Sequence, residues 1–517
     1  MADPISIISV VDLCFKYGAL LVERCSAFAH AESELLERSV RVKNYWIRAE
    51  TQLKLVRSIA HTLDDEHQAV QQETLELLAS KLKITVNSIQ SVTKATDVNG
   101  GSVRQVQRWK YALLRQKIDG AIQDLELWQK MFDPSWYLIM KAATSQIDAD
   151  LHAFKHAVPA ENRAPITSAQ SLRTALDATS TSNLRIFLRE DGISSLQLTD
   201  LPLCSAQWAQ REDPSKALIL ERFQPSAGVN IRQLEKDARD LARKLAHSSP
   251  TEFGLLNCKG VVKHSGDDPA SRDPTAFTFI FRIPTGYSRP RSLRSCLTEM
   301  QGTDSLSDRF SLANELARSV SYVHTFGFVH KNIRPETILL LTNDSSVGSA
   351  FLIGFDSFRM AEGKTLRKGD AAWERSLYQH PSRMGLVPTE DYIMQHDIYS
   401  LGVCLLELGL WESFVQYQDK TASLPNDGSS LNPTRHSVLG NDLPPVLFKD
   451  HLVALARGEL RSKMGTRYAE IVETCLTCLD PYNVDFGDAD EFVDEDGIQI
   501  AVRYIEKVTM KLNNICV

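Results

Sequence analysis

The chain has 517 residues, more than one ordinary hydrophobic core organises, so we expect two or three domains. Hydrophobic residues make up 43% and charged residues 24% of the sequence, a composition that is typical of globular proteins and excludes the disordered and fibrous classes. The 58 basic and 65 acidic residues give a net charge of −7, so no global basic field recruits nucleic acid, and we expect no nucleic-acid partner.

Residues 1–22 form the most apolar stretch of their length, and charged residues interrupt it. Asp12 and Lys16 divide it before the ~20 apolar residues that a membrane-spanning helix requires. It also lacks the basic start of a signal peptide. We therefore predict an amphipathic helix that does not span a membrane. Its expected apolar face consists of Ile8, Val11, Phe15, Ala19 and Val22.

Helical periodicity continues over residues 5–142. Four segments carry single apolar seams at alternating spacings of three and four, and the connections between them are short. This signature predicts an all-α, antiparallel four-helix bundle over residues 1–142. Pro134 is expected to follow the end of the fourth helix.

Three arginines, Arg104, Arg108 and Arg115, share one stripe of the fourth segment. The simpler interpretation of this stripe is a solvated helix face. The functional interpretation is contact with anionic lipid head groups, where each Lys or Arg near the membrane contributes about 1 kcal/mol.

Beyond this region the composition changes twice. Residues 143–185 are small and polar with two prolines, and we interpret them as a brace or linker. Strand-like apolar runs begin near residue 186, and the chain becomes mostly helical after residue 290. This order predicts an α+β, two-lobed domain, with a small lobe over about 186–286 and a large lobe over about 287–517.

Three further features favour structural interpretations. Residues 423–445 are rich in Pro, Gly, Ser and Asn and are expected to form a surface loop. Residues 485–497 are acidic but fit no calcium-binding loop register. Cys475 and Cys478 form a CxxC pair without nearby ligands, so two reduced thiols are favoured over a redox or zinc site, and we expect no metal and no cofactor.

The region from 186 onward resembles the protein kinase family. Residues 330–337 (HKNIRPET) occupy the frame of the kinase catalytic loop H-R-D-L-x-x-x-N, residues 354–356 (GFD) that of D-F-G, and residues 397–403 (DIYSLGV) that of the helix pattern D-x-Y-S-x-G-V. The resemblance implies a protein-kinase-like fold with two lobes.

The positions that carry phosphoryl-transfer chemistry in that family are substituted here. Asn332 stands where an aspartate accepts the proton of the substrate hydroxyl, and an amide cannot do so at neutral pH. Thr337 and Gly354 stand where an asparagine and an aspartate hold magnesium. Asp356, two residues after Gly354, is the alternative metal ligand. In an extended segment its side chain points the same way as that of residue 354, but its carboxylate is shifted along the strand by roughly two residues' rise, or ~7 Å.

The ATP-positioning elements are also missing. The family's V-A-I-K lysine falls at Leu220 or Glu221, and no glycine-rich loop precedes it. Removing a single group that stabilises the charge of the transition state costs roughly two to three orders of magnitude in rate. Since several such groups are missing together, we expect no enzymatic activity and no catalytic residue.

The residues that brace the loop remain. By resemblance, His330 and Asp397 hold the catalytic-loop backbone, and Gly402 belongs to the same helix pattern as Asp397. Pro335 fixes φ within the loop. Lys331 and Phe355 are further positions of the degenerate motifs: Lys331 stands at the arginine of H-R-D and Phe355 at the phenylalanine of D-F-G. A retained frame without its chemistry is what a pseudokinase looks like.

The N-terminal region resembles the fungal HeLo and HeLo-like (prion-inhibition and propagation) domains, through its apolar opening over residues 1–22 and the amphipathic helix that follows. The combined plan is similar to the mixed-lineage kinase domain-like executioners of necroptosis. The resemblance implies a protein that rests in the cytoplasm, oligomerises, and permeabilises the plasma membrane through anionic phospholipids after an upstream protein releases the first helix. Ile8, Val11, Phe15 and the arginine stripe are the membrane-active candidates.

Two alternatives remain open. A signalling adaptor, in which both domains only bind proteins, predicts partner capture without membrane association and indifference to a charge at Ile8 or Phe15. An atypical active kinase predicts magnesium-dependent ATP turnover that Asp356→Ala abolishes.

Overall fold

The structure is a computed structural model, and the chain divides into two compact units, Met1–Arg173 and Thr174–Val517, each of which is described by itself. It describes all residues except 1–3, 28–32, 63–64, 95–102, 143–145, 158–162, 177–185, 195, 211–216, 226–229, 266–273, 300–304, 344–347, 357, 361–371, 386–387, 389, 418–424, 429–430, 432–444, 487–497 and 516–517. The predicted surface loop and the predicted acidic loop lie largely outside the described residues.

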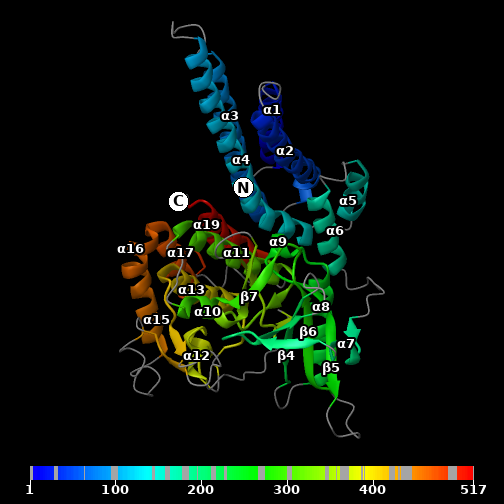
Figure 1. Ribbon diagram of the computed structural model, residues 1–517, viewed down its shortest axis with the longest axis vertical. Coiled ribbons are helices and arrows are strands. Elements are labelled where there is room, and N and C mark those ends of the chain that lie inside the picture. Colours follow the sequence, from blue (N-terminus) through cyan, green and yellow to red (C-terminus); the bar gives the residue numbers. More distant parts are fainter. Residues whose placement is uncertain are drawn as a thin grey trace. The chain divides into compact units, whose positions relative to one another are not determined.

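The N-terminal unit is helical, as its periodicity predicts. The long helices α1 to α4 dominate it (Figure 1), with α1 in contact with α2 and α3, and α4 in contact with the same two helices. Its elements are α1 (Pro4–Ser26), α2 (Ser33–Ile59), the 3₁₀ turn η1 (Ala60–Thr62), α3 (Asp65–Lys94), α4 (Val103–Ala142), α5 (Gln146–Ala157) and α6 (Ala164–Leu176).

The packed face of α1 differs from the predicted one. Its centre is Gly18, because the indole of Trp46 lies directly over this glycine: a Cβ at Gly18 would lie 2.1 Å from the Trp46 ring. Ile8 and Phe15 of the predicted face are only half-buried, and Ala19 is exposed. The close approach at the glycine therefore turns the helix by about one residue, or ~100°. The buried residues of this face are Ile7, Val11, Cys14, Gly18 and Leu21.

The prediction that the fourth helix ends before Pro134 is wrong. Helix α4 continues through Pro134 to Ala142. A proline inside a helix removes one backbone hydrogen bond and costs about 3 kcal/mol. The turns after it bury five large apolar side chains, which offsets that cost. These are Trp136, Tyr137, Leu138, Ile139 and Met140.

The segment interpreted as a brace contains two helices, α5 and α6. Arg173 on α6 binds both carboxylate oxygens of Asp148 on α5, at 2.6 and 2.7 Å, and donates to the Met140 carbonyl at 2.9 Å. One guanidinium thus joins α6 to α5 and to the end of α4.

The C-terminal unit begins with a six-stranded mixed sheet in the order β1-β5-β6-β4-β3-β2, in which only β1 and β5 pair in parallel. The apolar runs read as strands correspond to β1, β4, β5 and β6. The β2–β3 hairpin went unpredicted, because β2 is fully exposed and shows no apolar alternation. The strands are β1 (Phe187–Leu188), β2 (Gln197–Asp200), β3 (Ala206–Gln210), β4 (Leu218–Phe223), β5 (Asn257–Ser265) and β6 (Pro274–Arg282).

Smaller sheets follow among the helices of this unit. In the three-stranded sheet β10-β9-β7, strands β9 and β10 lie between the loop that resembles a catalytic loop (residues 330–337) and the turn that resembles D-F-G (residues 354–356). Two-stranded ladders join β11 to β8 and β12 to β13. These strands are β7 (Ser288–Ser292), β8 (Phe328–Val329), β9 (Ile338–Thr342), β10 (Ser349–Leu352), β11 (Arg359–Met360), β12 (Val415–Tyr417) and β13 (Pro425–Asp427).

The helices of this unit gather mainly after β7. In Figure 1, β4, β5, β6 and α8 lie at one side of the unit, and α13, α15, α16 and α17 lie at the other. Helix α13 forms the centre, with every one of its 17 residues buried. The helices are α7 (Asp191–Ser194), α8 (Ile231–Ala246), α9 (Pro250–Phe253), α10 (Leu293–Thr298), α11 (Leu306–Thr325), η4 (Pro335–Thr337), α12 (Trp373–Ser376), η5 (Pro381–Arg383), α13 (Met394–Leu410), α15 (Pro445–Leu455), η7 (Ala456–Leu460), α16 (Arg461–Met464), α17 (Thr466–Leu476), α18 (Ile498–Tyr504), η9 (Ile505–Met510) and α19 (Lys511–Asn513).

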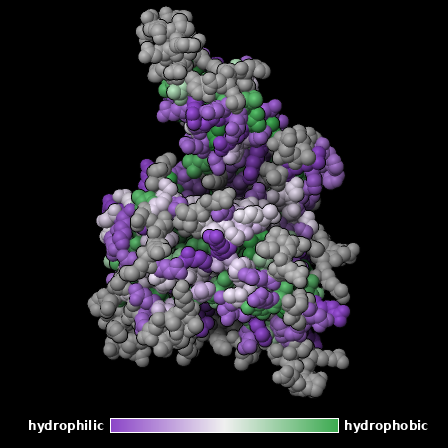
Figure 2. Space-filling model, in the orientation of Figure 1, coloured by the Kyte–Doolittle hydropathy of each residue, from purple (hydrophilic) through white to green (hydrophobic). Residues whose placement is uncertain are grey.

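The described surface is mixed in polarity. On the face shown in Figure 2, hydrophobic residues form small groups between hydrophilic ones. Among the described helices, none is long and apolar enough to cross a membrane.

Candidate functional site

The candidate site is the loop that follows β8, together with the turn that follows β10. Asp397, at the start of α13, fixes the loop backbone: its Oδ2 accepts the N–H of His330 at 2.7 Å and its Oδ1 accepts the N–H of Lys331 at 2.9 Å. Lys331 has a φ of 66°, in the left-handed region. A residue that is not glycine is strained there, so the two bonds to Asp397 hold the loop in an unfavourable conformation.

Asp397 is fully buried and carries a charge that its neighbours stabilise. Burial alone would raise its pKa, but hydrogen bonds from His324 and Tyr392 and the neighbouring imidazoles outweigh burial, so the pKa of Asp397 is lowered. His330 is also fully buried, and burial lowers its pKa to about 4. A charged aspartate and a neutral imidazole therefore brace the loop at neutral pH.

Asn332 makes structural contacts at the position of the catalytic base. Its Nδ2 donates to Asp356 Oδ1 at 2.8 Å and to the Gly354 carbonyl at 3.2 Å, and its Oδ1 accepts from Arg334 Nε at 2.8 Å. The side-chain amide thus uses both its ends to join the loop to the turn. Asp356, the alternative metal ligand, is exposed and is one of these partners.

Thr337 and Gly354, at the positions that the sequence predicts to be metal-holding in the kinase family, are packed against each other. Gly354 has a φ of +92°, and a Cβ there would lie 2.3 Å from Thr337 Cγ2 and 2.5 Å from Thr337 Cβ. The Thr337 hydroxyl donates to the carbonyls of Asn332 and Arg334, at 2.7 and 2.9 Å. A side chain at residue 354 would overlap the threonine, so the two substitutions depend on each other.

Of the two candidates for the lysine position, Glu221 reaches the site. Leu220 packs in the core of the six-stranded sheet with Leu218 and Ile280, whereas Glu221 Oε2 accepts the N–H of Phe355 at 3.3 Å. Glu221 is 1% exposed, and its Oε1 has no hydrogen-bond partner in the described part of the chain. Burial, with a contribution from the charge of Asp356, raises the pKa of Glu221 to about 8.

Phe355, Pro335 and Gly402 complete the retained frame. The Phe355 ring is buried with its centroid 4.7 Å from that of His330. Pro335 begins the short helix η4. Gly402 lets α13 approach α17 closely, since a Cβ there would lie 2.8 Å from the Cβ of Cys475.

Sequence reasoning missed a buried ion-pair network below the loop. Arg294, which is fully buried, binds Glu336 Oε1 at 3.0 Å and Glu407 Oε1 at 2.6 Å, and it also contacts the hydroxyl of Tyr378. Burial alone would lower the pKa of Arg294, but the two carboxylates hold it well above its usual range. The signal that could have revealed the network is Glu407, a lone carboxylate in the apolar run of α13.

The membrane-active candidates lie in the other unit. Val11 is fully buried, while Ile8 and Phe15 are half-buried. Arg104 and Arg108 belong to α4, but their side chains lie outside the described residues. Arg115 is exposed and pairs with Glu34 at 3.2 Å. The one arginine of the stripe that the structure describes is therefore already paired with a carboxylate.

Chemically, the site joins polypeptide segments. Among the described residues, no cluster of three or more His, Cys, Asp or Glu side chains is placed to hold a metal ion. The amide of Asn332, the hydroxyl of Thr337 and the carboxylate of Glu221 all bind backbone or side-chain groups of this chain.

Comparisons with known proteins agree with a kinase-like region. No protein-family profile matches the chain. It is similar to the eukaryotic translation initiation factor 2-alpha kinase 1 of Mus musculus, with 34% identity over 101 residues, and to that of Rattus norvegicus, with 33% identity over 104 residues. Each match covers 18% of this chain and 16% of the relative. The similarity and the order of the sheet and helices support a kinase-like region within the second unit.

Proposed function

We propose that the C-terminal unit is a pseudokinase that binds and restrains rather than phosphorylates. The observation that carries this proposal is the packing of Gly354 on Thr337, which leaves no room for a metal-holding side chain at residue 354. Glu221 adds to it, because a buried carboxyl group at the position expected for the phosphate-binding lysine supplies no cation to hold phosphate groups. In this proposal the substituted residues connect segments of the chain to one another instead of binding ATP and metal.

The test is an assay of ATP turnover and phosphoryl transfer by the full chain with magnesium. We expect no turnover above the background of a heat-denatured sample. Magnesium-dependent turnover that Asp356→Ala abolishes, and that the exposed-carboxylate control Asp450→Ala retains, would instead establish an active kinase and overturn the proposal.

For the N-terminal unit, we propose a four-helix bundle that acts on membranes. An upstream protein releases α1, the unit oligomerises at the anionic plasma membrane and permeabilises it, and the cell dies in a manner like necroptosis or heterokaryon incompatibility. The support is the resemblance of residues 1–142 to HeLo-like domains and the construction of α1. Its packed face includes the close contact of Gly18 with Trp46, and its neighbouring face keeps Ile8 and Phe15 half-buried.

Dye-loaded anionic liposomes test this mechanism with a matched pair of variants. Gly18→Leu displaces Trp46 and loosens α1, whereas Ala19→Leu adds the same side chain at an exposed position of the same helix. We expect Gly18→Leu to raise the rate of dye release at least fivefold above the wild type, with Ala19→Leu close to the wild type. Equal release by the two variants, or none from either, would argue against a releasable helix.

A signalling adaptor is the second candidate, and the pairing of Arg115 with Glu34 favours it because it reduces the charge available to lipids. This function predicts no lipid association. It also predicts that Ile8→Glu and Phe15→Glu leave protein partners bound.

A further inference from the structure

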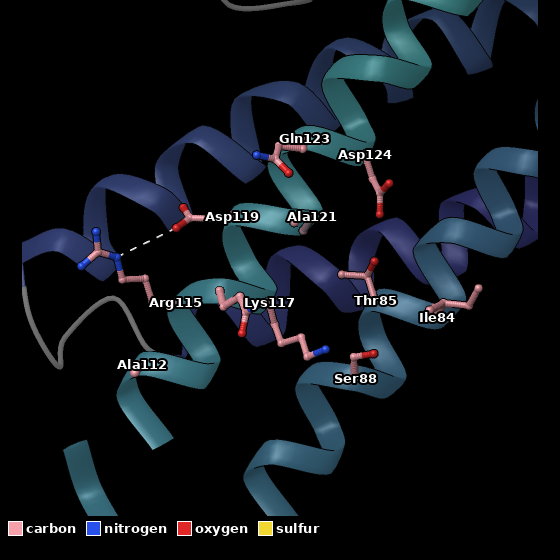
Figure 3. A pocket seen from close by; sticks show the side chains of 12 residues that line it. Ile84, Thr85, Ser88, Ala112, Arg115, Lys117, Asp119, Ala121, Gln123 and Asp124 are labelled. Carbon is pink, nitrogen blue, oxygen red and sulfur yellow. Dashed lines mark ion pairs between the residues drawn. The ribbon is translucent and has the colours of Figure 1, made fainter. Parts of the chain in front are cut away.

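The surface between α3 and α4 contains a hollow of about 570 Å³. We call it the α3–α4 hollow and define it by Ile84, Thr85 and Ser88 of α3 and by Lys117, Gly120 and Asp124 of α4. Figure 3 shows the side chains of Thr85, Ser88, Lys117 and Asp124 extending into the space between the two helices. Arg115 and Asp119 point to the other side of α4.

Gly120 lines the hollow. It lies in the middle of α4, where glycine costs about 1 kcal/mol relative to alanine. A Cβ at Gly120 would meet no atom within 4 Å, so close packing inside the chain does not require the glycine. Across from it, Ile84 is 62% exposed. The surface therefore places an exposed apolar side chain beside an open space, at the expense of helix stability.

The charges of the hollow exclude a strongly charged ligand. The two charged side chains that extend into the hollow are one cation, Lys117, and one anion, Asp124, so their formal sum is zero. An anionic lipid head group or a nucleotide would meet as much repulsion as attraction.

The same charges are arranged for a second copy of this surface. Lys117 lies three residues before Gly120 and Asp124 four residues after it, so the two lie about 10.5 Å apart along one face of α4. In an antiparallel two-fold contact centred between Gly120 and Ala121, Lys117 of each copy faces Asp124 of the other. Both groups can form a further ion pair. Within the described residues Lys117 has no ion-pair partner, and Asp124 binds Lys81 through one of its two carboxylate oxygens, Oδ1, at 2.7 Å.

We propose that the α3–α4 hollow is a self-association surface, in which α4 of a second copy lies over Gly120 and Ile84 enters the open space. The contact is isologous, so it closes as a dimer. A contact confined to this one hollow predicts a weak, reversible dimer. The inference requires neither a membrane nor a release of α1, so it stands or falls separately from the proposed function.

Sedimentation velocity of the full chain without lipid tests the surface, over roughly 1–200 µM, the range in which small interfaces dissociate. We expect a monomer–dimer equilibrium. Gly120→Leu fills the hollow without a clash in the single chain and improves helix propensity, and it should raise the dimer Kd at least tenfold. Gly458→Leu, at a helical glycine that also faces open space, is the matched control and should leave the Kd unchanged.

Charge exchange tests the register. Lys117→Asp places two carboxylates opposite each other, and Asp124→Lys places two ammonium groups opposite each other, so each variant alone should associate at least tenfold more weakly. An equimolar mixture of the two should associate again, because every facing pair is then of opposite charge. A wild type that stays monomeric, a Gly120→Leu variant that dimerises like the wild type, or a mixture that fails to associate would each overturn the proposal.

Discussion

Gly354→Ala tests whether Thr337 fills the space beside residue 354, or whether the kinase-like site only lacks metal-holding side chains. The substitution forces an L-residue into a φ of +92°, which costs about 1–2 kcal/mol. It also sets a Cβ 2.3 Å from Thr337 Cγ2, an overpacking that costs about 1–3 kcal/mol. Together these effects predict a loss of about 2–5 kcal/mol in the stability of this region.

Hydrogen exchange of the full chain measures this loss locally, as the opening free energy of the peptide that covers residues 349–356. Gly286→Ala is the control, because Gly286 has a φ of +85° and open space at its Cβ, so it reports backbone strain alone. The double variant Gly354→Ala/Thr337→Ser removes the nearer clashing atom while keeping the hydroxyl, and should recover part of the loss. If Gly354→Ala costs no more than Gly286→Ala, the two sites are not packed as described.

Three further predictions concern buried charges. The fold raises the pKa of Glu221 to about 8, so its contribution to the free energy of unfolding is complete below pH ~4.5 and is lost as pH rises through ~8. Unfolding free energies measured at about pH 5, 7 and 9 should therefore decrease with pH in the wild type. Glu221→Gln should remove this decrease. Asp397→Asn leaves one of two loop amides without an acceptor and should cost about 3–5 kcal/mol in urea unfolding; a loss below ~1 kcal/mol would contradict the bracing role. Arg294→Met should cost a similar ~3–5 kcal/mol by leaving Glu336 and Glu407 unpaired, and adding Glu407→Leu should restore part of it.

The elements that the sequence predicts are those whose local pattern also matches their burial. Helix α13 and the strand β9 are apolar runs that are buried throughout or nearly so, and pattern alone locates them. The face of α1 could not be located in this way, because Gly18 contributes nothing to an apolar pattern, yet Trp46 lies on it. Similarly, Pro134 reads as a helix end, and only the burial of the residues that follow it explains why α4 continues.

At the candidate site, motif spacing locates the substituted positions but not their new contacts. Asn332, Thr337 and Gly354 stand at recognisable positions of the sequence. The bond from Phe355 to Glu221 joins residues 134 positions apart, and that from Arg294 to Glu407 joins residues 113 positions apart. No local pattern encodes such pairs, because each depends on how segments distant in the sequence pack against each other.

The Glu221 contact joins the six-stranded sheet to the turn at Phe355. A site that had only lost its function would be stabilised by an apolar residue at position 221, since a buried carboxylate with one unpartnered oxygen is unfavourable. Glu221 instead links strand β4 to the turn at Phe355 through a group whose raised pKa lies near neutrality. Near pH 8 this link is at the midpoint of its titration, and ionisation places a second carboxylate beside Asp356.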